Sequence, residues 1–358
     1  MLKKAGTLLL ICASLAAWIS CGKTATHYLY AAIPASNEIY AYREDPNSGI
    51  LTLLALSPIG AGIGVQSLAL HPSNKYLYAA NSGESDVSLF TISSDGALNE
   101  QLPRQTVGVE PTMLAIDPAG AYLYVANAGS NSISVFSISS SNGSLTPITQ
   151  SSSGGPQAPL GLSPINMKLS PSGNVLYVTG QGVLGGEVQA FTLTSGQLAL
   201  VQTPFQAGNN PAGLAVSPNG YLYTANSLDN SISEFSIGTG GALTPIAGSP
   251  IGETYLSPLA LLVSNSGNFL CIANEGSSNI AVYSIGSDGS LSVVSTSPFA
   301  SNAEPAFIAS DPNSDYVFMG NQSSPAVQSF GLSGGSGTLT EVASYPLPGT
   351  ATSIVVVP

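Results

Sequence analysis

Residues Pro111–Pro118 read PTMLAIDP, and the next three segments read YLYVAN (Tyr122–Asn127), SISVFSI (Ser132–Ile138) and SLTPI (Ser144–Ile148). Short segments rich in β-branched and aromatic residues, separated by glycine, proline, asparagine and serine, are typical of strands joined by turns. The same order of segments returns about every 47 residues from Tyr28 to the C-terminus. A repeat of roughly 40 to 50 residues with four strands per unit predicts a β-propeller, in which each unit is one blade.

The second aromatic residue of the YLYVAN segment marks the register of the repeat. It falls at seven positions, which are Tyr30, Tyr78, Tyr124, Tyr177, Tyr223, Cys271 and Phe318. The first unit lacks its opening segment, and Thr352–Pro358 at the C-terminus matches the missing one. We therefore predict an all-β fold, a seven-bladed β-propeller with four-stranded blades. The C-terminal strand should pair with the N-terminal blade and close the ring, which removes exposed sheet edges.

The N-terminus has the pattern of an export signal. It reads MLKK, continues with an apolar run from Thr7 to Ile19, and ends in Ser20-Cys21-Gly22. A basic start before roughly a dozen apolar residues is typical of a secretory signal and too short for a transmembrane helix. The segment around Cys21 is similar to a bacterial lipobox, in which the cysteine is acylated and becomes the new N-terminus.

These features predict three parts of the chain. Residues 1–20 form a lipoprotein signal peptide, residues 21–27 a lipidated tether, and residues 28–358 a single propeller domain. We expect an exported, lipid-anchored protein of the cell envelope, in the outer membrane if the cell is diderm, because Gly22 and not aspartate follows Cys21. Signal cleavage nearby without lipidation of Cys21 is the alternative.

The composition excludes some partners. Only 7% of the residues are charged, and the formal net charge is −12, whereas about 25% of residues in a typical soluble domain are charged. Nucleic acid binding needs a basic stripe that displaces counterions from phosphate, and this sequence has none. Contact with a membrane is expected only through the lipid anchor, and the protein is expected to be a monomer.

Recurring residues mark the face of the ring on which a ligand is expected. Proline opens the first segment and asparagine closes the second, and both positions lie at the end of the ring that usually frames the central funnel. Residues that recur in every blade serve folding, whereas residues that break the pattern are better candidates for function. Glu110 and Glu304 break the pattern directly before the first-segment proline, and Glu275 follows Asn274.

The candidates for catalytic groups are Glu110, Glu304 and Glu187. Glu187 ends the atypical turn Thr179–Glu187 of the fourth blade, and long atypical loops on a regular scaffold often carry binding. Carboxylate and amide oxygens that converge on a funnel can bind Ca²⁺. The metal candidates are therefore Glu110, Glu304, Asn127 and Asn274. The alternative is that the acids are solvated loop residues and the asparagines turn formers.

Histidine and arginine are scarce where chemistry is expected. The repeat places His27 and His71 at the opposite end of the ring, and no histidine or arginine maps to the funnel face. A general base near neutral pH is most readily a histidine, so the sequence offers no clear catalytic set.

The segments Asn210–Asn226 (NPAGLAVSPNGYLYTAN) and Ser231–Ile237 (SISEFSI), together with the Leu-Thr-Pro-Ile and Ser-Pro-Ile motifs at Leu145 and Ser249, resemble the seven-bladed lactonase family. That family includes 6-phosphogluconolactonase-like and muconate-cycloisomerase-like propellers and is related to YVTN-repeat proteins. The resemblance implies a propeller over essentially all of the chain from Tyr28. It also implies funnel-side histidine, arginine and glutamate, of which only glutamates are present here.

Two functions of different classes remain open. The first is a membrane-anchored scaffold that binds an unknown protein, glycan or small molecule through its funnel-face loops. The second is a sugar-lactone hydrolase similar to 6-phosphogluconolactonase, with Ca²⁺ as a candidate cofactor. Whether the protein is an enzyme is thus undecided by the sequence. The missing histidine and arginine favour the scaffold.

Replacing Cys21 with alanine should abolish acylation, because the thiol that carries the lipid is lost. The measurement is incorporation of labelled palmitate in the expressing cell, together with the distribution of the protein between membrane and soluble fractions. Cys12→Ala, a change in the same segment, is the matched control and should leave both unchanged. Equal labelling of the Cys21→Ala variant and the natural protein would reject lipidation at Cys21.

Overall fold

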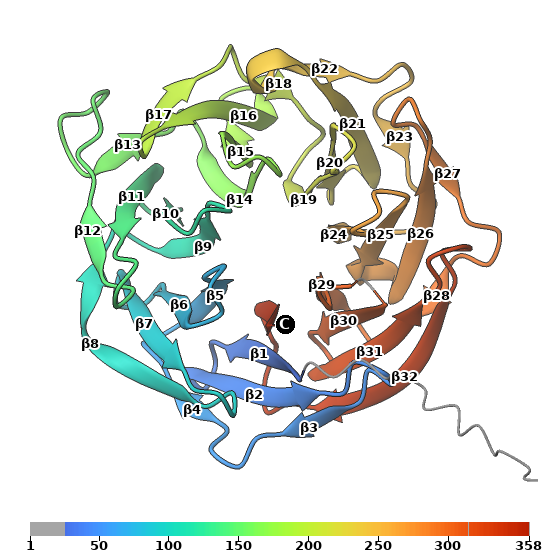
Figure 1. Cartoon of the computed structure of the whole chain (residues 1–358). Coiled ribbons are helices and arrows are strands. Elements are labelled where there is room, and N and C mark those ends of the chain that lie inside the picture. Colours follow the sequence, from blue (N-terminus) through green and yellow to red (C-terminus); the bar gives the residue numbers. More distant parts are fainter. Residues whose placement is uncertain (1–25, 314, 358) are drawn as a thin grey trace, which may run out of the picture.

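The computed structural model describes residues 26–313 and 315–357. These residues form seven antiparallel sheets arranged around a central axis (Figure 1). The prediction of an all-β, seven-bladed propeller is confirmed. The predicted signal peptide and the lipidation site Cys21 lie outside the described residues. No helix of the described part is long and apolar enough to span a bilayer.

Blade 1 contains both ends of the described chain, and blades 2 to 7 follow in chain order. The inner strands of blades 1 to 7 are β33 (Ser353–Val357), β5 (Val65–Leu70), β9 (Pro111–Ile116), β14 (Ser163–Leu169), β19 (Pro211–Val216), β24 (Pro258–Val263) and β29 (Pro305–Ser310). The second strands are β1 (His27–Ile33), β6 (Tyr76–Asn81), β10 (Tyr122–Asn127), β15 (Val175–Gly182), β20 (Tyr221–Asn226), β25 (Phe269–Asn274) and β30 (Tyr316–Asn321).

The third strands lie further from the axis. They are β2 (Glu38–Glu44), β7 (Asp86–Ile92), β11 (Ser132–Ile138), β16 (Gly185–Thr194), β21 (Ser231–Ile237), β26 (Asn279–Ile285) and β31 (Ala326–Leu332). Two 3₁₀ turns connect strands within a blade. They are η1 (Thr239–Gly241) between the third and outer strands of blade 5, and η2 (Glu275–Ser277) between the second and third strands of blade 6.

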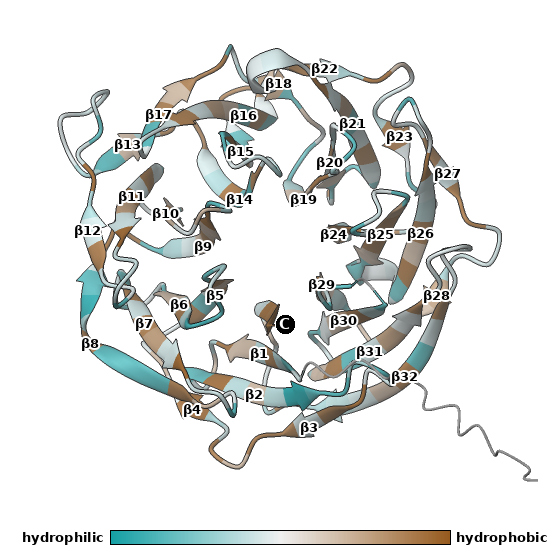
Figure 2. Ribbon diagram, in the orientation of Figure 1, coloured by the Kyte–Doolittle hydropathy of each residue, from teal (hydrophilic) through white to brown (hydrophobic). Residues whose placement is uncertain are grey.

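The outer strand is continuous in two blades and broken in five. The continuous strands are β8 (Leu98–Thr106) and β32 (Leu339–Pro346). The broken strands are β3 (Leu51–Leu53) with β4 (Ile59–Gly60), β12 (Leu145–Pro147) with β13 (Gln157–Pro159), β17 (Gln197–Leu200) with β18 (Phe205–Gln206), β22 (Leu243–Pro245) with β23 (Ile251–Gly252), and β27 (Leu291–Val293) with β28 (Phe299–Ala300). Figure 2 shows that β8 is mainly hydrophilic, as expected for a strand whose side chains are largely exposed.

At three of these breaks a serine hydroxyl accepts the hydrogen bond of a main-chain N–H group of the third strand. Proline follows the serine in each case and cannot donate a ladder hydrogen bond. The main-chain N–H of Ala41 donates to Ser57 Oγ at 2.9 Å, that of Glu234 to Ser249 Oγ at 2.8 Å, and that of Val282 to Ser297 Oγ at 2.9 Å. The recurring Ser-Pro motif is therefore structural.

The ring closes as the sequence predicts. β33 pairs with β1 in antiparallel register, with Val355 opposite Tyr30. Ser353 also reaches the next blade, because its Oγ accepts a hydrogen bond from Leu68 N at 3.0 Å. The C-terminal strand thus completes blade 1 and contacts blade 2.

The register-mark tyrosines fasten each blade to the next. The hydroxyl of Tyr223 donates to the carbonyl oxygen of Gly289 at 2.8 Å, and Tyr30 does the same to Gly96 at 2.7 Å. Both bonds are buried, and burial raises the pKa of these phenols, so the hydroxyls remain donors. The acceptor glycines have positive φ, +84° at Gly289 and +81° at Gly96, a conformation that glycine adopts without steric cost.

Replacing Tyr223 with phenylalanine should lower the free energy of unfolding by about 1–3 kcal/mol, because it leaves the buried carbonyl of Gly289 without its donor. Urea unfolding of the natural and variant proteins measures the difference. Tyr221→Phe is the matched control, since Tyr221 donates to Ser287 O in an exposed bond and should cost less. Equal losses for the two variants would contradict the importance of the buried bond.

Candidate functional site

Six inner strands carry a β-bulge near their start. At each bulge one residue of the inner strand has no partner on the second strand, and these residues are Gln66, Thr112, Ile165, Ala212, Leu259 and Ala306. A bulge re-aims a side chain relative to the regular pleat, and bulges are frequent beside active sites. All six lie at the funnel face, the end of the ring where inner strands begin and second strands end.

A cavity of about 460 Å³ lies at this end of the ring. We call it the mouth cavity, and its lining residues are Pro34, Ala35, Gln66, Leu259, Ala306, Gln322, Thr350, Ala351 and Thr352. They come from four consecutive blades, 6, 7, 1 and 2. Three bulge residues are among them, so the bulges direct side chains into the cavity. Carboxamide and hydroxyl groups on an otherwise apolar wall are typical of small-molecule sites.

Two of the pattern-breaking glutamates lie beside the mouth cavity. Glu275 Oε1 accepts a hydrogen bond of 3.1 Å from Gln322 Nε2, and Gln322 is a lining residue. The Glu304 carbonyl accepts from Gln322 N at 2.9 Å. The Glu304 carboxylate accepts from Ser323 Oγ. Both glutamates are half-buried, so they are available to a ligand at the edge of the cavity.

Glu304 adopts a conformation that glutamate disfavours. Its φ is +59°, and Glu110 at the same place in blade 3 has a φ of +53°. Blade 2 has Gly64 there, with a φ of +68°. A left-handed non-glycine residue costs of order 1 kcal/mol or more, and such strain clusters at functional sites. The same left-handed φ recurs at the equivalent residues Asn210 (+52°) and Ser257 (+51°), so this conformation belongs to the fold of the loop and not to the glutamates alone.

The other predicted site residues lie away from the mouth cavity. Glu110 is exposed in blade 3, and Glu187 is buried in the β15–β16 hairpin opposite Gly180. The predicted long turn of blade 4 is in fact an extension of that hairpin, which reaches Gly182 and Gly185.

The predicted Ca²⁺ ligands come from three blades: Glu110 and Asn127 from blade 3, Asn274 from blade 6 and Glu304 from blade 7. Asn127 Nδ2 donates to Ser132 and Ser134 within blade 3, and Asn274 Nδ2 donates to Asn279 within blade 6. Their side-chain oxygens are buried and accept no hydrogen bond from any described residue. The Nδ2 groups of these two amides thus bind within their own blades. Calcium accordingly enters no chemical step below.

The prediction that no arginine reaches the funnel face is wrong in one place. Arg104, on β8, forms ion pairs with Glu84 at 2.5 Å and with Glu100 at 2.7 Å. Glu84 lies in the β6–β7 turn at the funnel face, and its carboxylate accepts from Ile63 N. The outer strand of blade 2 is continuous, which allows its arginine to reach that turn. Arg104 is ion-paired with two carboxylates and does not line the mouth cavity.

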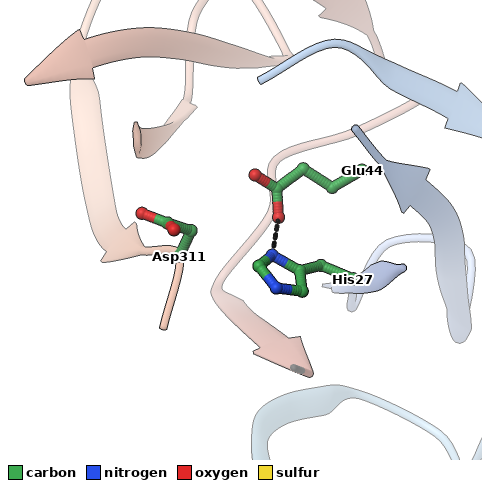
Figure 3. A group of neighbouring side chains, drawn as sticks. All are labelled: His27, Glu44 and Asp311. Carbon is green, nitrogen blue, oxygen red and sulfur yellow. Dashed lines mark hydrogen bonds and ion pairs between the residues drawn. The ribbon is translucent and has the colours of Figure 1, made fainter. Parts of the chain in front are cut away.

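The histidines lie at the opposite end of the ring, as the repeat predicts. His71 Nε2 lies 3.0 Å from Gly120 O and thereby joins blades 2 and 3. His27 Nδ1 lies 3.0 Å from Glu44 Oε2, and both side chains are buried within blade 1. Asp311 of blade 7 approaches this pair (Figure 3), and all three residues offer ligand atoms within 4.8 Å of one another.

This buried group is explained by its place at the junction of the first and last blades. The Asp311 carboxylate accepts hydrogen bonds from Asn313 N at 3.1 Å and Tyr316 N at 2.8 Å. Asp117 holds the matching turn of blade 3 in the same way, through Ala121 N and Tyr122 N. Asp311 therefore forms a turn that recurs in another blade, and the group serves the closure of the ring.

Sequence reasoning missed the polar residues of the mouth cavity, Gln66, Gln322, Thr350 and Thr352. A usable signal was present, because the position after the recurring proline varies from blade to blade while its neighbours repeat. Where the residue type varies between blades and the neighbouring positions repeat, the fold does not require a particular side chain at that position.

Comparisons with known proteins agree with the architecture. Solved structures with this fold include a protein from Lactobacillus plantarum (21% identity, TM-score 0.79, 93% of this chain and 99% of that chain covered) and a candidate 6-phosphogluconolactonase of Bacteroides fragilis (18%, 0.79, 94% and 99%). The periplasmic gluconolactonase of Pseudomonas aeruginosa is also similar (20%, 0.77, 93% and 99%). No curated protein matches.

The family comparison covers nearly the whole chain. The model of the lactonase, seven-bladed β-propeller family matches residues 4–112, 102–210, 157–258 and 257–356. The overlapping matches follow the internal repeat of the blades. The chain thus belongs to the lactonase family of seven-bladed β-propellers.

Proposed function

We propose that the protein hydrolyses sugar lactones at the mouth cavity. The observation that carries the proposal is the cavity of about 460 Å³ in a lactonase-family chain, with Glu275 hydrogen-bonded to its lining residue Gln322. The gluconolactonase activity named for the similar Pseudomonas aeruginosa protein supports the same reaction class. The lining residues include no lysine, arginine or histidine, which favours an unphosphorylated lactone.

The chemistry requires a base and hydrogen-bond donors. In the proposed reaction a water oxygen bonds to the lactone carbonyl carbon while Glu275 or Glu304 accepts the proton. The ring ester C–O bond then breaks, and the proton passes to the departing alkoxide. The carboxamides of Gln66 and Gln322 are the donors available to the carbonyl oxygen as it gains negative charge. The product is a hydroxy acid.

We also propose that the protein acts in the cell envelope, held by a lipid on Cys21. The support is the basic and apolar N-terminal segment that ends at this cysteine. Few charged residues and many serine, threonine and asparagine residues are consistent with an exported protein.

A scaffold function is the second candidate. It is favoured by exposed apolar side chains in the funnel-face loops of five blades, which are Ile63, Val109, Val183, Leu184, Leu228 and Leu256. Exposed apolar groups that gather on one face are typical of binding surfaces. The ligand would then be a protein, a glycan or a small molecule bound without turnover.

Replacing Glu275 or Glu304 with glutamine tests the hydrolase proposal. Loss of the general base should lower kcat/KM by about 100-fold or more while leaving the fold intact. The measurement is hydrolysis of glucono-δ-lactone and its 6-phosphate, corrected for spontaneous hydrolysis, with Ca²⁺ and with a chelator.

Glu110→Gln is the matched control, because Glu110 has the same backbone position as Glu304 but lies away from the mouth cavity. Its activity should equal that of the natural protein. A well-folded natural protein with no rate above the spontaneous background would reject the hydrolase and leave the scaffold. Faster hydrolysis of the phosphorylated lactone would reject the substrate class proposed above.

Replacing Glu304 with glycine should raise or preserve the thermal unfolding temperature while lowering the activity. Glycine relieves the left-handed backbone strain, and its effect on stability is expected to be about 1 kcal/mol at most. Differential scanning calorimetry measures the first effect and the lactone assay the second. A clear drop in stability would show that Glu304 serves the fold.

A further inference from the structure

One inner-strand residue is charged. The seven inner strands contain no aspartate, glutamate, arginine or histidine, and their only charged side chain is that of Lys168 on β14. It lies opposite Tyr177 in the β14–β15 register. In the other six blades the residue opposite the register mark is aliphatic, namely Val355, Ala69, Ala115, Ala215, Leu262 and Ala309. Lys168 therefore replaces the aliphatic residue that the other six blades have at this position.

Lys168 lies on the inner wall of the ring. Its side chain is exposed to solvent, although β14 is an inner strand with neighbouring inner strands on both sides, β9 and β19. Desolvation by the surrounding protein nevertheless lowers the pKa of the ammonium group. The inner strands of a propeller line its central channel, so an exposed side chain on β14 is expected to face that channel. Lys168 forms no ion pair with any other residue of the described part of the chain.

An enclosed cation without a protein counter-ion is costly, and an anion that enters the channel lowers that cost. We propose that the central channel binds a small carboxylate at Lys168. A carboxylate is favoured over phosphate, because a single lysine among aliphatic neighbours offers one positive charge and no second cation for a dianion. This site deepens the proposed function, since a hydroxy carboxylate is the product of lactone hydrolysis.

The position of Lys168 separates this site from the mouth cavity. Lys168 lies three residues beyond the bulge residue Ile165, and a strand rises about 3.3 Å per residue, so the two levels are roughly 10 Å apart. Lys168 is also absent from the lining of the mouth cavity. An acid released at the mouth cavity therefore has a separate place to bind deeper in the ring.

Binding of sodium gluconate to the full-length protein tests the site. Isothermal titration calorimetry at constant ionic strength should show saturable binding, and Lys168→Met should weaken it about tenfold or more. Lys75→Met is the matched control, because Lys75 is an exposed lysine in a turn at the opposite end of the ring. The Lys75→Met variant should bind gluconate as the natural protein does. Inorganic phosphate should bind more weakly than gluconate.

A second readout does not depend on the methionine variant folding. Reductive ¹³C-methylation labels each lysine, and gluconate should shift the NMR signal of Lys168 while leaving that of Lys75 in place. Lys168→Arg keeps the charge and should retain most of the affinity. Gluconate binding unchanged in Lys168→Met, an unmoved Lys168 signal, or tighter binding of phosphate would each overturn the proposal. Since no turnover is measured, failure of the lactone assay with intact gluconate binding would reject only the proposed reaction.

Discussion

The structure depends on a buried hydrogen bond between neighbouring blades. A tyrosine hydroxyl on the second strand of one blade donates to a glycine carbonyl in the turn between the third and outer strands of the next. Tyr78 and Tyr177 repeat this bond to Gly143 and Gly241. In blade 3 the donor to the next glycine carbonyl is Gln150, which bonds to Gly196 O at 3.0 Å. The bond fixes the spacing between blades, because a shift of one blade would leave a buried carbonyl without a donor.

The two junctions around blade 7 differ, because Cys271 and Phe318 replace the tyrosine and have no hydroxyl to donate. Burial raises the pKa of the Cys271 thiol to about 12, as expected for a small apolar residue inside the core. Other polar contacts join the same blades. Gln322 binds Glu275 between blades 6 and 7, and the Tyr345 hydroxyl accepts from Leu51 N at 2.8 Å between blades 7 and 1. The mouth cavity and the ring closure both lie beside these two junctions.

The fold could be predicted from the sequence because its determinants are local and repeated. The proline at the start of β9 and the asparagine at the end of β10 recur in most blades, and they fall at strand ends as predicted. The site could not be predicted in the same way. Glu110 and Glu304 occupy equivalent positions, yet only Glu304 lies beside the mouth cavity. That difference depends on Pro34 and on Thr350–Thr352, which meet only when the chain ends are joined.

The bulges have a consequence for how such a ring can change over time. A bulge residue such as Gln66 or Thr112 takes no part in the residue pairing of its sheet, whereas the flanking residues carry the pairing. Exchanging a bulge side chain alters the chemistry around the axis at little cost to the ladder. Each of the six bulged blades therefore contributes one side chain to the recognition surface that can change almost independently of the others. A propeller of this kind can diverge in ligand preference through single exchanges while its architecture stays constant, which is consistent with structural agreement at about one-fifth sequence identity.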